Sequence, residues 1–204
     1  DQYHPLDYRF TADRVVSILD EYNCIQMHIT SSFVKADTAK EMAFNEKLTY
    51  AEDTEYITRI LLKEKKYGLL SSACHFYKVR TNESSALQNK QASPEYFTAT
   101  IDLFYNGIIS LSKELYGEVI PYIQYLLAYD IQWRLKQPLP AEVPSETKEK
   151  CRAALTGVLL HIEDAILFGQ KNLSPEMKVY ALSLKYGRDI RKELVFNKGS
   201  FSFN

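Results

Sequence analysis

The sequence predicts an α+β fold that is mostly helical, with few strands, all in the first part of the chain. Up to about residue 90, short segments of alternating polarity, typical of strands, are mixed with segments of helical periodicity. Beyond that point the apolar spacing is almost entirely helical, and Ser-Pro-Glu triplets and glycines mark where helices begin and end. We therefore expect a mixed region over residues 1–90 and an all-α helical bundle over residues 91–204.

In the first region we expect helices and strands to alternate. Residues 10–22 have Thr11 as a candidate N-cap and an apolar stripe of Val15, Ile18 and Leu19, so a helix is predicted there. Residues 24–29 place Ile25, Met27 and Ile29 on one face, which predicts a strand. The remaining predictions are a short helix over 36–42, a loop over 44–50, a helix over 54–66 capped near Gly68, a strand over 73–79 and a loop over 80–92.

The helical region is predicted to contain four well-delimited helices and a short fifth helix before the tail. The four cover residues 93–116, 119–136, 145–169 and 174–187. The most apolar run, Val119 to Leu135, has nearly the length of a membrane-spanning helix, but polar residues interrupt it and a central Asp130 is costly in hydrocarbon. We expect a buried helix of the bundle; a membrane-proximal adaptor that uses this face is the weaker alternative.

The charge and cysteine content exclude several classes of partner and site. The 25 basic and 26 acidic residues nearly cancel, so neither a nucleic-acid partner nor a polybasic membrane strip is expected. Cys24, Cys74 and Cys151 lie far apart without metal-ligand spacing and are predicted to be reduced, buried thiols in a cytosolic compartment. No charged-then-apolar leader opens the sequence, so a secretory signal is not expected.

Two adjacent carboxylates, Glu52 and Asp53, directly precede an amphipathic segment. At a helix start such groups accept bonds from unpaired backbone N–H groups and are worth about 0.5–2 kcal/mol as a cap. A carboxylate held there beside a polar strand end is also oriented well for a general base. Both interpretations stay open. A second pair, Glu163 and Asp164, is predicted to lie mid-helix among apolar residues and to be structural.

Other candidate residues have weaker signals. His28 and His75 lie in predicted strands without a spaced metal-binding partner and are expected to be structural or to line a cleft. No G-x-S-x-G, Gly-rich phosphate loop or H-E-x-x-H motif occurs, which gives hydrolase, NTPase and metalloprotease activities little support.

Aromatic side chains recur near helical spacing in the most apolar segment. They are Tyr116, Tyr122, Tyr125, Tyr129 and Trp133. Such a stripe most often belongs to the core, with hydroxyls at its edge. The alternative is an exposed stripe that stacks on sugars or contacts another subunit.

Several short motifs of the first region occur in a characteristic order. An apolar segment ends in small polar residues, and a short helix, "FNEKL" (44–48), the Glu52-Asp53 pair, Gly68, "HFYKVR" (75–80) and Ser84-Ser85 follow. This order resembles the second half of a family 2 glycosyltransferase domain with the GT-A fold, as in bacterial enzymes that build capsular, teichoic acid-like or other surface polysaccharides. The resemblance covers roughly residues 4–90. The segment "YGEVIPYIQYLLAYDIQWRLK" also resembles the helical region that follows the catalytic domain in larger members.

The resemblance implies a role for each matching residue. Asp53 matches the catalytic base, which deprotonates an acceptor hydroxyl as it attacks the anomeric carbon of a nucleotide-sugar with inversion. Glu52 matches the neighbouring residue that helps to hold the acceptor. The polar residues expected near the acceptor at the cleft wall are Thr30, Ser31 and Ser32. Arg80, together with Lys78, matches the basic strand end where cations can neutralise a leaving diphosphate.

The sequence also departs from the family pattern. Lys78 and Val79 replace the more usual Arg-Lys, and the donor-binding half with its Asp-x-Asp motif does not occur in these 204 residues. The resemblance therefore implies Mg²⁺ or Mn²⁺ only for a complete enzyme, and neither a metal site nor a cofactor is expected within this segment. We expect these residues alone to be inactive.

The partners implied are a nucleotide-sugar donor and a glycan or polyol acceptor. The implied location is cytoplasmic, at or near the inner face of the membrane, with scope for peripheral membrane association and for self-association through the helical region. The alternative function is a non-catalytic helical interaction or oligomerisation module, in which the first region is only scaffold.

Overall fold

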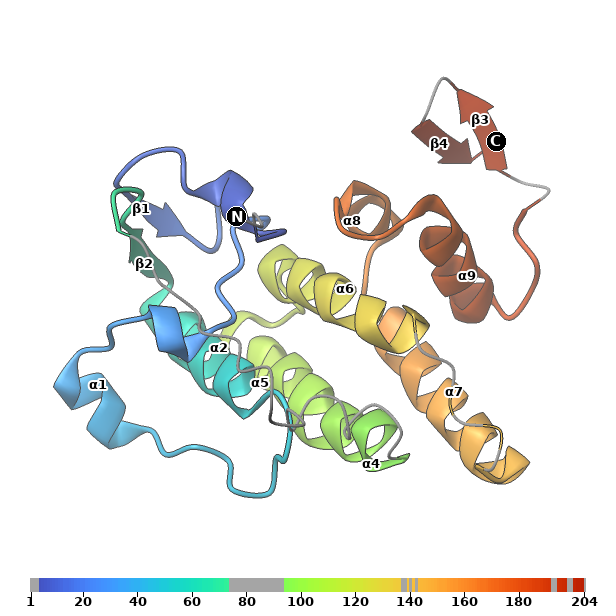
Figure 1. The fold of residues 1–204 in the computed structure, drawn as a ribbon, viewed down its shortest axis with the longest axis horizontal. Helices are drawn as coiled ribbons and strands as arrows, with labels where there is room; N and C mark the ends of the chain where they lie inside the picture. Colours follow the sequence, from blue (N-terminus) through green and yellow to red (C-terminus); the bar gives the residue numbers. More distant parts are fainter. Residues whose placement is uncertain are drawn as a thin grey trace, which may run out of the picture.

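The computed structural model describes residues 4–73, 94–136, 139, 141 and 143–191, with the backbone alone for 94, 95, 194–197 and 200–203. The predicted class is confirmed, because the fold is mostly helical α+β (Figure 1). The elements are η1 (Asp7–Arg9), β1 (Arg14–Ser17), η2 (Ile29–Ser31), α1 (Ala36–Glu41), α2 (Glu52–Glu64), β2 (Lys66–Leu69), α4 (Pro94–Phe97), the π-helical turn η3 (Ile101–Tyr105), α5 (Asn106–Tyr116), α6 (Pro121–Lys136), α7 (Ser145–Leu159), α8 (Asp164–Gly169), α9 (Pro175–Tyr186), β3 (Leu194–Asn197) and β4 (Ser200–Phe203).

Helix α6 occupies the centre of the helical layer. Figure 1 shows α2 and α5 on one side of it and α7, α8 and α9 on the other. Eleven of its sixteen residues are buried, which confirms the predicted buried helix. One hydrophobic cluster extends from Leu6 to Ile190 through this helix, so residues of both predicted regions share a core. The boundary predicted near residue 90 falls among residues that the structure does not describe.

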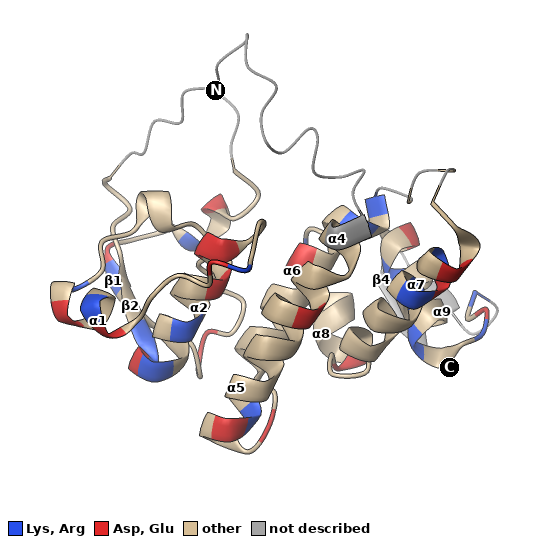
Figure 2. Ribbon diagram, turned by 90° about the horizontal axis from the view of Figure 1, so that it is seen from below, with Lys and Arg blue, Asp and Glu red and all other residues tan. Residues whose placement is uncertain are grey.

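Two further expectations bear on the exterior and on the cysteines. Among the described residues, no helix combines the length and the apolar character that crossing a bilayer requires. Acidic and basic residues are interspersed along the helices in the view of Figure 2. Cys24 and Cys151 are buried free thiols, as predicted, and Cys74 lies outside the described residues.

The prediction of a helix over residues 10–22 is wrong. This segment contains β1, which pairs antiparallel with β2 so that Val15 lies opposite Gly68 and Val16 opposite Tyr67. Val16 is fully buried while Val15 is 66% exposed, which is the two-residue alternation of a strand. The adjacent β-branched valines favour this pairing over a helix.

The cap predicted near Gly68 is also wrong, since this glycine lies within β2. Helix α2 ends earlier, at Glu64, and its C-cap residue Lys65 adopts a left-handed conformation with φ of 62°. Its N–H donates to the Leu61 carbonyl at 2.8 Å, and its own carbonyl accepts from the Ile18 N–H at 2.9 Å. The chain can therefore enter β2 directly after the helix.

The later helices follow the predicted punctuation with three exceptions, the first being that the helix predicted over 93–116 is divided into α4, η3 and α5. Gly117 and Gly187 end α5 and α9 with positive φ, and the Ser174 side chain caps α9 by accepting from the Met177 N–H. The helix predicted over 145–169 is broken between α7 and α8. The short helix predicted before the tail is instead the antiparallel hairpin of β3 and β4.

The break in this helix changes the context of Glu163 and Asp164, which were predicted to lie mid-helix. Glu163 is the N-cap residue of α8, and its N–H donates to Gln124 Oε1 at 2.8 Å. Asp164 accepts from Lys185 Nζ at 2.6 Å and from the Tyr186 hydroxyl at 2.5 Å. The predicted position is wrong, but both carboxylates take part in contacts that hold α8 against its neighbours.

Residues 24–28, which we call the extended segment, do not form the predicted strand with any described residue. Ile25 and Met27 are buried as expected, but side chains supply the hydrogen bonds of the backbone. The bonds are Tyr67 hydroxyl to Cys24 O (2.6 Å), Arg9 to Ile25 O, Gln26 N to Tyr122 hydroxyl (3.0 Å), Thr54 Oγ1 to Met27 O (3.1 Å) and Ser32 Oγ to His28 O (2.8 Å). The segment is thereby fixed between α2, α6 and β2.

We predict that Tyr122→Phe lowers the free energy of unfolding by about 1–3 kcal/mol, because the buried Gln26 N–H loses its acceptor. Denaturant-induced unfolding measures this loss. Tyr180→Phe, at a tyrosine that is 51% exposed on α9, is the matched control and should change stability by less than about 0.5 kcal/mol. Equal effects of the two substitutions would contradict the prediction.

Candidate functional site

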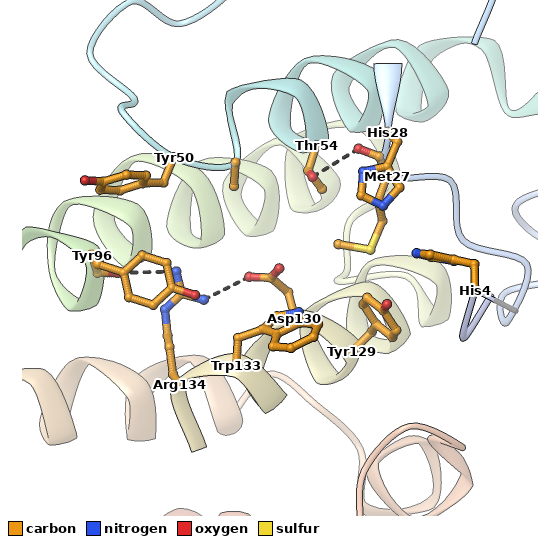
Figure 3. A pocket seen from close by; sticks show the side chains of 11 residues that line it. His4, Met27, His28, Tyr50, Thr54, Tyr96, Tyr129, Asp130, Trp133 and Arg134 are labelled. Carbon is orange, nitrogen blue, oxygen red and sulfur yellow. Dashed lines mark hydrogen bonds and ion pairs between the residues drawn. The ribbon is translucent and has the colours of Figure 1, made fainter. Parts of the chain in front are cut away.

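A pocket of about 480 Å³ lies between the start of α2 and the second half of α6 (Figure 3). Its volume is in the range of small-molecule sites. Its walls come from the N-terminal segment, the extended segment, the residues around the start of α2, α4 and α6. The lining residues are His4, Met27, His28, Tyr50, Ala51, Thr54, Tyr96, Tyr129, Asp130, Trp133 and Arg134. Both predicted regions of the chain therefore build it.

Glu52 and Asp53 are the first two residues of α2 and are half-buried. Neither lines the pocket, but Ala51 and Thr54 on either side of them do. Asp53 Oδ1 accepts from the Thr54 N–H at 2.8 Å, so the helix-start interpretation of this carboxylate is correct. The Thr54 hydroxyl in turn donates to Met27 O at 3.1 Å and ties the start of α2 to the extended segment.

His28 is the nearest ionisable partner of Asp53. Its Nδ1 lies 3.8 Å from Asp53 Oδ2, with 48% of the histidine and 29% of the aspartate side chain exposed. Burial acts to raise the pKa of the Asp53 carboxyl, but the His28 imidazole and the Thr54 N–H outweigh it, and the pKa lies below its ordinary value. Asp53 is therefore fully ionised at neutral pH.

His4 extends the polar side of the pocket beyond His28. The two rings meet edge to face with their centroids 5.5 Å apart. Burial lowers the pKa of His4, and the neighbouring His28 lowers it further. His4 Nδ1 accepts from the Leu6 N–H at 3.2 Å, which leaves the Nε2–H of a neutral ring as a donor toward the pocket.

Ala51, directly before the carboxylate pair, has a strained backbone. Its φ of 61° and ψ of 21° place it in the left-handed region, and it caps α2 without a side-chain hydrogen bond. A residue with a Cβ adopts this conformation at a cost of about 1–2 kcal/mol. Such strain is frequent at functional sites, where the surrounding structure holds the backbone in place.

Asp130 and Arg134 form a buried ion pair on α6. Arg134 Nη1 lies 2.9 Å from Asp130 Oδ2, with only 1% and 13% of the two side chains exposed. The Tyr105 hydroxyl donates to the same oxygen at 2.5 Å and accepts from Arg134. The guanidinium carbon lies 4.3 Å from the centre of the Tyr96 ring and 4.8 Å from that of Tyr105. The cation is thus paired, hydrogen-bonded and stacked.

Sequence reasoning missed the role of this pair. It treated Asp130 and Arg134 only as interruptions of an apolar run. An Asp followed four residues later by Arg inside such a run was the available signal, because buried charges require partners and these two positions share a helix face.

The other residues predicted for the site lie apart from the pocket. Thr30 and Ser31 are exposed in η2, and Ser32 is half-buried, with its hydroxyl accepting from Gln26 Nε2 at 2.9 Å and donating to His28 O. They follow His28 directly but do not line the pocket. Lys78 and Arg80 lie outside the described residues. Within the described part of the chain, no three acidic, histidine or cysteine residues could hold a metal ion together.

The aromatic stripe of α5 and α6 divides between core and surface. Tyr122, Tyr125 and Tyr129 are buried, which confirms the predicted core role, and the hydroxyls of Tyr122 and Tyr116 bond to the Gln26 N–H and to Leu62 O. Trp133 differs, because it is 39% exposed where it lines the pocket. For this residue the alternative of a stacking surface stays open.

We predict that Ala51→Gly raises the free energy of unfolding by up to about 1 kcal/mol, since glycine adopts the left-handed conformation without strain but gains freedom in the unfolded chain. Thermal and denaturant unfolding measure the change. A loss of stability would contradict the strain at this position. Lys65→Gly, at the only other described non-glycine residue with positive φ, is the comparison.

We predict that His28→Asn raises the pKa of Asp53, because burial is then less opposed. Because the pKa of Asp53 is lowered on folding, its carboxylate stabilises the fold at pH values above the ordinary pKa of 3.8, and this stabilisation is lost as the pH falls through the folded-state pKa. The variant should lose part of this stabilisation. Carboxyl-detected NMR titration measures the pKa. His161→Asn, in the turn between α7 and α8, should leave it unchanged, and an equal rise in both variants would refute the pairing.

The chain is similar to two curated proteins of Bacillus subtilis (strain 168). It is 28% identical over 188 residues to the minor teichoic acid biosynthesis protein GgaB, a match that covers 91% of this chain and 21% of that protein. It is 30% identical over 131 residues to the minor teichoic acid biosynthesis protein GgaA, covering 63% of this chain and 29% of that protein. The chain thus spans less than a third of either relative. No family model and no solved structure matches it.

Proposed function

We propose that the chain is part of an inverting glycosyltransferase of surface polysaccharide assembly and supplies its catalytic base and acceptor side. The observation that carries the proposal is the placement of Asp53, an ionised carboxylate fixed at the start of α2 and paired with His28 at the edge of the pocket. The order of motifs around Asp53 supports it, and so do two relatives whose names place them in teichoic acid biosynthesis.

In the proposed reaction Asp53 acts on an acceptor hydroxyl. The carboxylate accepts the hydroxyl proton while the oxygen attacks the anomeric carbon of the donor sugar, and the nucleoside diphosphate leaves with the bonding electron pair. A carboxylate is a weak base toward an alcohol, so transfer of the proton becomes favourable only as the new bond forms. The proposed role of Glu52 is to hold the acceptor beside this base. Thr30, Ser31 and Ser32 extend that contact.

For the donor side of the reaction, we propose only which residues meet the leaving diphosphate. Arg80 and Lys78 are proposed to neutralise the leaving diphosphate. The described residues do not fit a Mg²⁺ or Mn²⁺ site, because they bring no three suitable ligands together. We therefore assign any metal and the nucleotide pocket to the remainder of a longer enzyme of the family 2, GT-A type. A cytoplasmic location, where nucleotide-sugars occur, is part of the same proposal.

The pocket favours this function over a separate helical interaction module. Asp130 and Trp133 of α6 line the same pocket as Thr54 of α2, so the helical region contributes to the site and does not only pack behind it. The α6 face considered for a membrane-proximal adaptor is largely buried in the core.

The central test is Asp53→Asn in the full-length enzyme. We predict that kcat for transfer from the nucleotide-sugar falls by about 10²–10⁴-fold, the usual contribution of a general base, while donor binding and the melting temperature change little. Initial-rate kinetics and donor titration measure the two effects. Asp37→Asn, at an exposed carboxylate of α1, should retain full activity. Activity near the wild-type level in Asp53→Asn would rule out the assignment.

A further inference from the structure

On the α6 side of the pocket, one carboxylate oxygen has no hydrogen-bond partner among the described residues. Asp130 Oδ2 is occupied by Tyr105 and Arg134, but Oδ1 has no partner among the described residues. Figure 3 shows this carboxylate directed into the space between α6 and the start of α2. An accessible carboxylate oxygen without a protein partner in a pocket is available to a ligand with hydroxyls to offer.

Aromatic rings face the same space. Trp133 lines the pocket and is 39% exposed, with Lys136 Nζ 4.7 Å from the centre of its ring, and the half-buried Tyr50 and Tyr96 also line the pocket. A carboxylate acceptor beside aromatic side chains suits a molecule that has hydroxyl groups along its edge and C–H groups on its face.

The charge of the wall favours a neutral ligand. Arg134 is the only lysine or arginine among the described residues that line the pocket, and Asp130 neutralises it at 2.9 Å. Its Nη1 donates to Asp130 Oδ2 and to the Tyr105 hydroxyl, and its Nη2 donates to Tyr96 O at 3.3 Å, so the parallel N–H groups needed to grip a phosphate are already engaged.

We propose that this part of the pocket binds a neutral polyhydroxylated unit of the acceptor, a sugar ring or a polyol. Asp130 Oδ1 accepts hydrogen bonds from its hydroxyls, and Trp133 packs against its C–H face. That the bound unit belongs to the acceptor rests on the proposed function, whereas the binding of a neutral polyhydroxylated unit does not. His28 lines the pocket and pairs with Asp53, so a unit held on α6 presents its neighbouring hydroxyl toward the base.

The tryptophan itself supplies the first test, because Trp133 is the only tryptophan of the chain. The 204-residue chain is titrated with glucose, N-acetylglucosamine, ribitol and glycerol while tryptophan fluorescence is recorded. We expect a saturable change with millimolar affinity for at least one of them, the strength usual for small polar ligands. The two sugars and the two polyols separate ring from open-chain recognition.

Two substitutions distinguish stacking from simple proximity. By ligand-observed NMR, Trp133→Leu should weaken binding by about tenfold, whereas Trp133→Phe, which keeps an aromatic face, should retain most of it. Tyr180→Leu removes an aromatic residue of α9 that is 51% exposed and should have no effect. In the full-length enzyme Trp133→Leu should raise the KM for the acceptor and leave the KM for the donor unchanged.

The outcomes separate this inference from the proposed function. No response to any of the four compounds, a response only to inorganic phosphate, or equal binding by the two Trp133 variants would overturn the neutral-ligand site. Loss of transfer in Asp53→Asn together with absent binding would overturn the site alone. Saturable binding together with full activity of Asp53→Asn would retain the site and remove the base.

Discussion

The fold around the site depends on how the backbone of the extended segment is satisfied. Four consecutive buried residues, 24–27, and the exposed His28 pass between α2 and α6 without pairing with a described strand, and an unpaired buried peptide group is costly. Side chains of Arg9, Thr54, Tyr67 and Tyr122 supply the missing partners. Each comes from a different element, so one stretch of backbone fixes four elements at once. The stretch ends at His28, and the same bonds therefore determine where Asp53 finds its partner.

A second constraint acts from the bundle side of the pocket. Arg134 is a cation with 1% of its side chain exposed, and it can stay there only because Asp130 and Tyr105 surround it. Those contacts fix the rotation of α6 about its own axis relative to the π-helical turn. The rotation in turn determines which residues of α6 reach the pocket, and Trp133 and Asp130 are among them. The buried Arg134 cation therefore both fixes the packing of the bundle and determines which residues of α6 line the pocket.

Sequence reasoning succeeded where local signals agreed with packing. The apolar spacing of Tyr56, Ile57 and Ile60 predicted α2, and the Ser174 cap predicted α9. It failed where partners distant in the chain decide the outcome. Val15 and Val16 carry a helix-compatible pattern, but pairing with β2 makes them a strand. No local pattern reveals that side chains from four elements will satisfy residues 24–28.

The same distinction holds for the site. The proposal for Asp53 could be made from the sequence because its dipeptide, its helix and the motifs around it are contiguous. The pocket could not, since it joins Thr54 to Asp130 and Trp133 across an interval of more than seventy residues. A polar residue in an apolar run can be buried in the core or can line a pocket. Only the segments that the fold packs against it decide which.

The π-helical turn at Ile101–Tyr105 has a geometric consequence for Arg134. Tyr96 and Tyr105 are nine residues apart, and in a regular α-helix at about 100° per residue their side chains would point to opposite sides. A π-turn accommodates one additional residue without advancing the helix, which reduces the angle between them to about 80°. Both rings can then flank one guanidinium. Removing a single residue from this turn would leave the apolar stripe recognisable but would turn one of the two rings away from the cation.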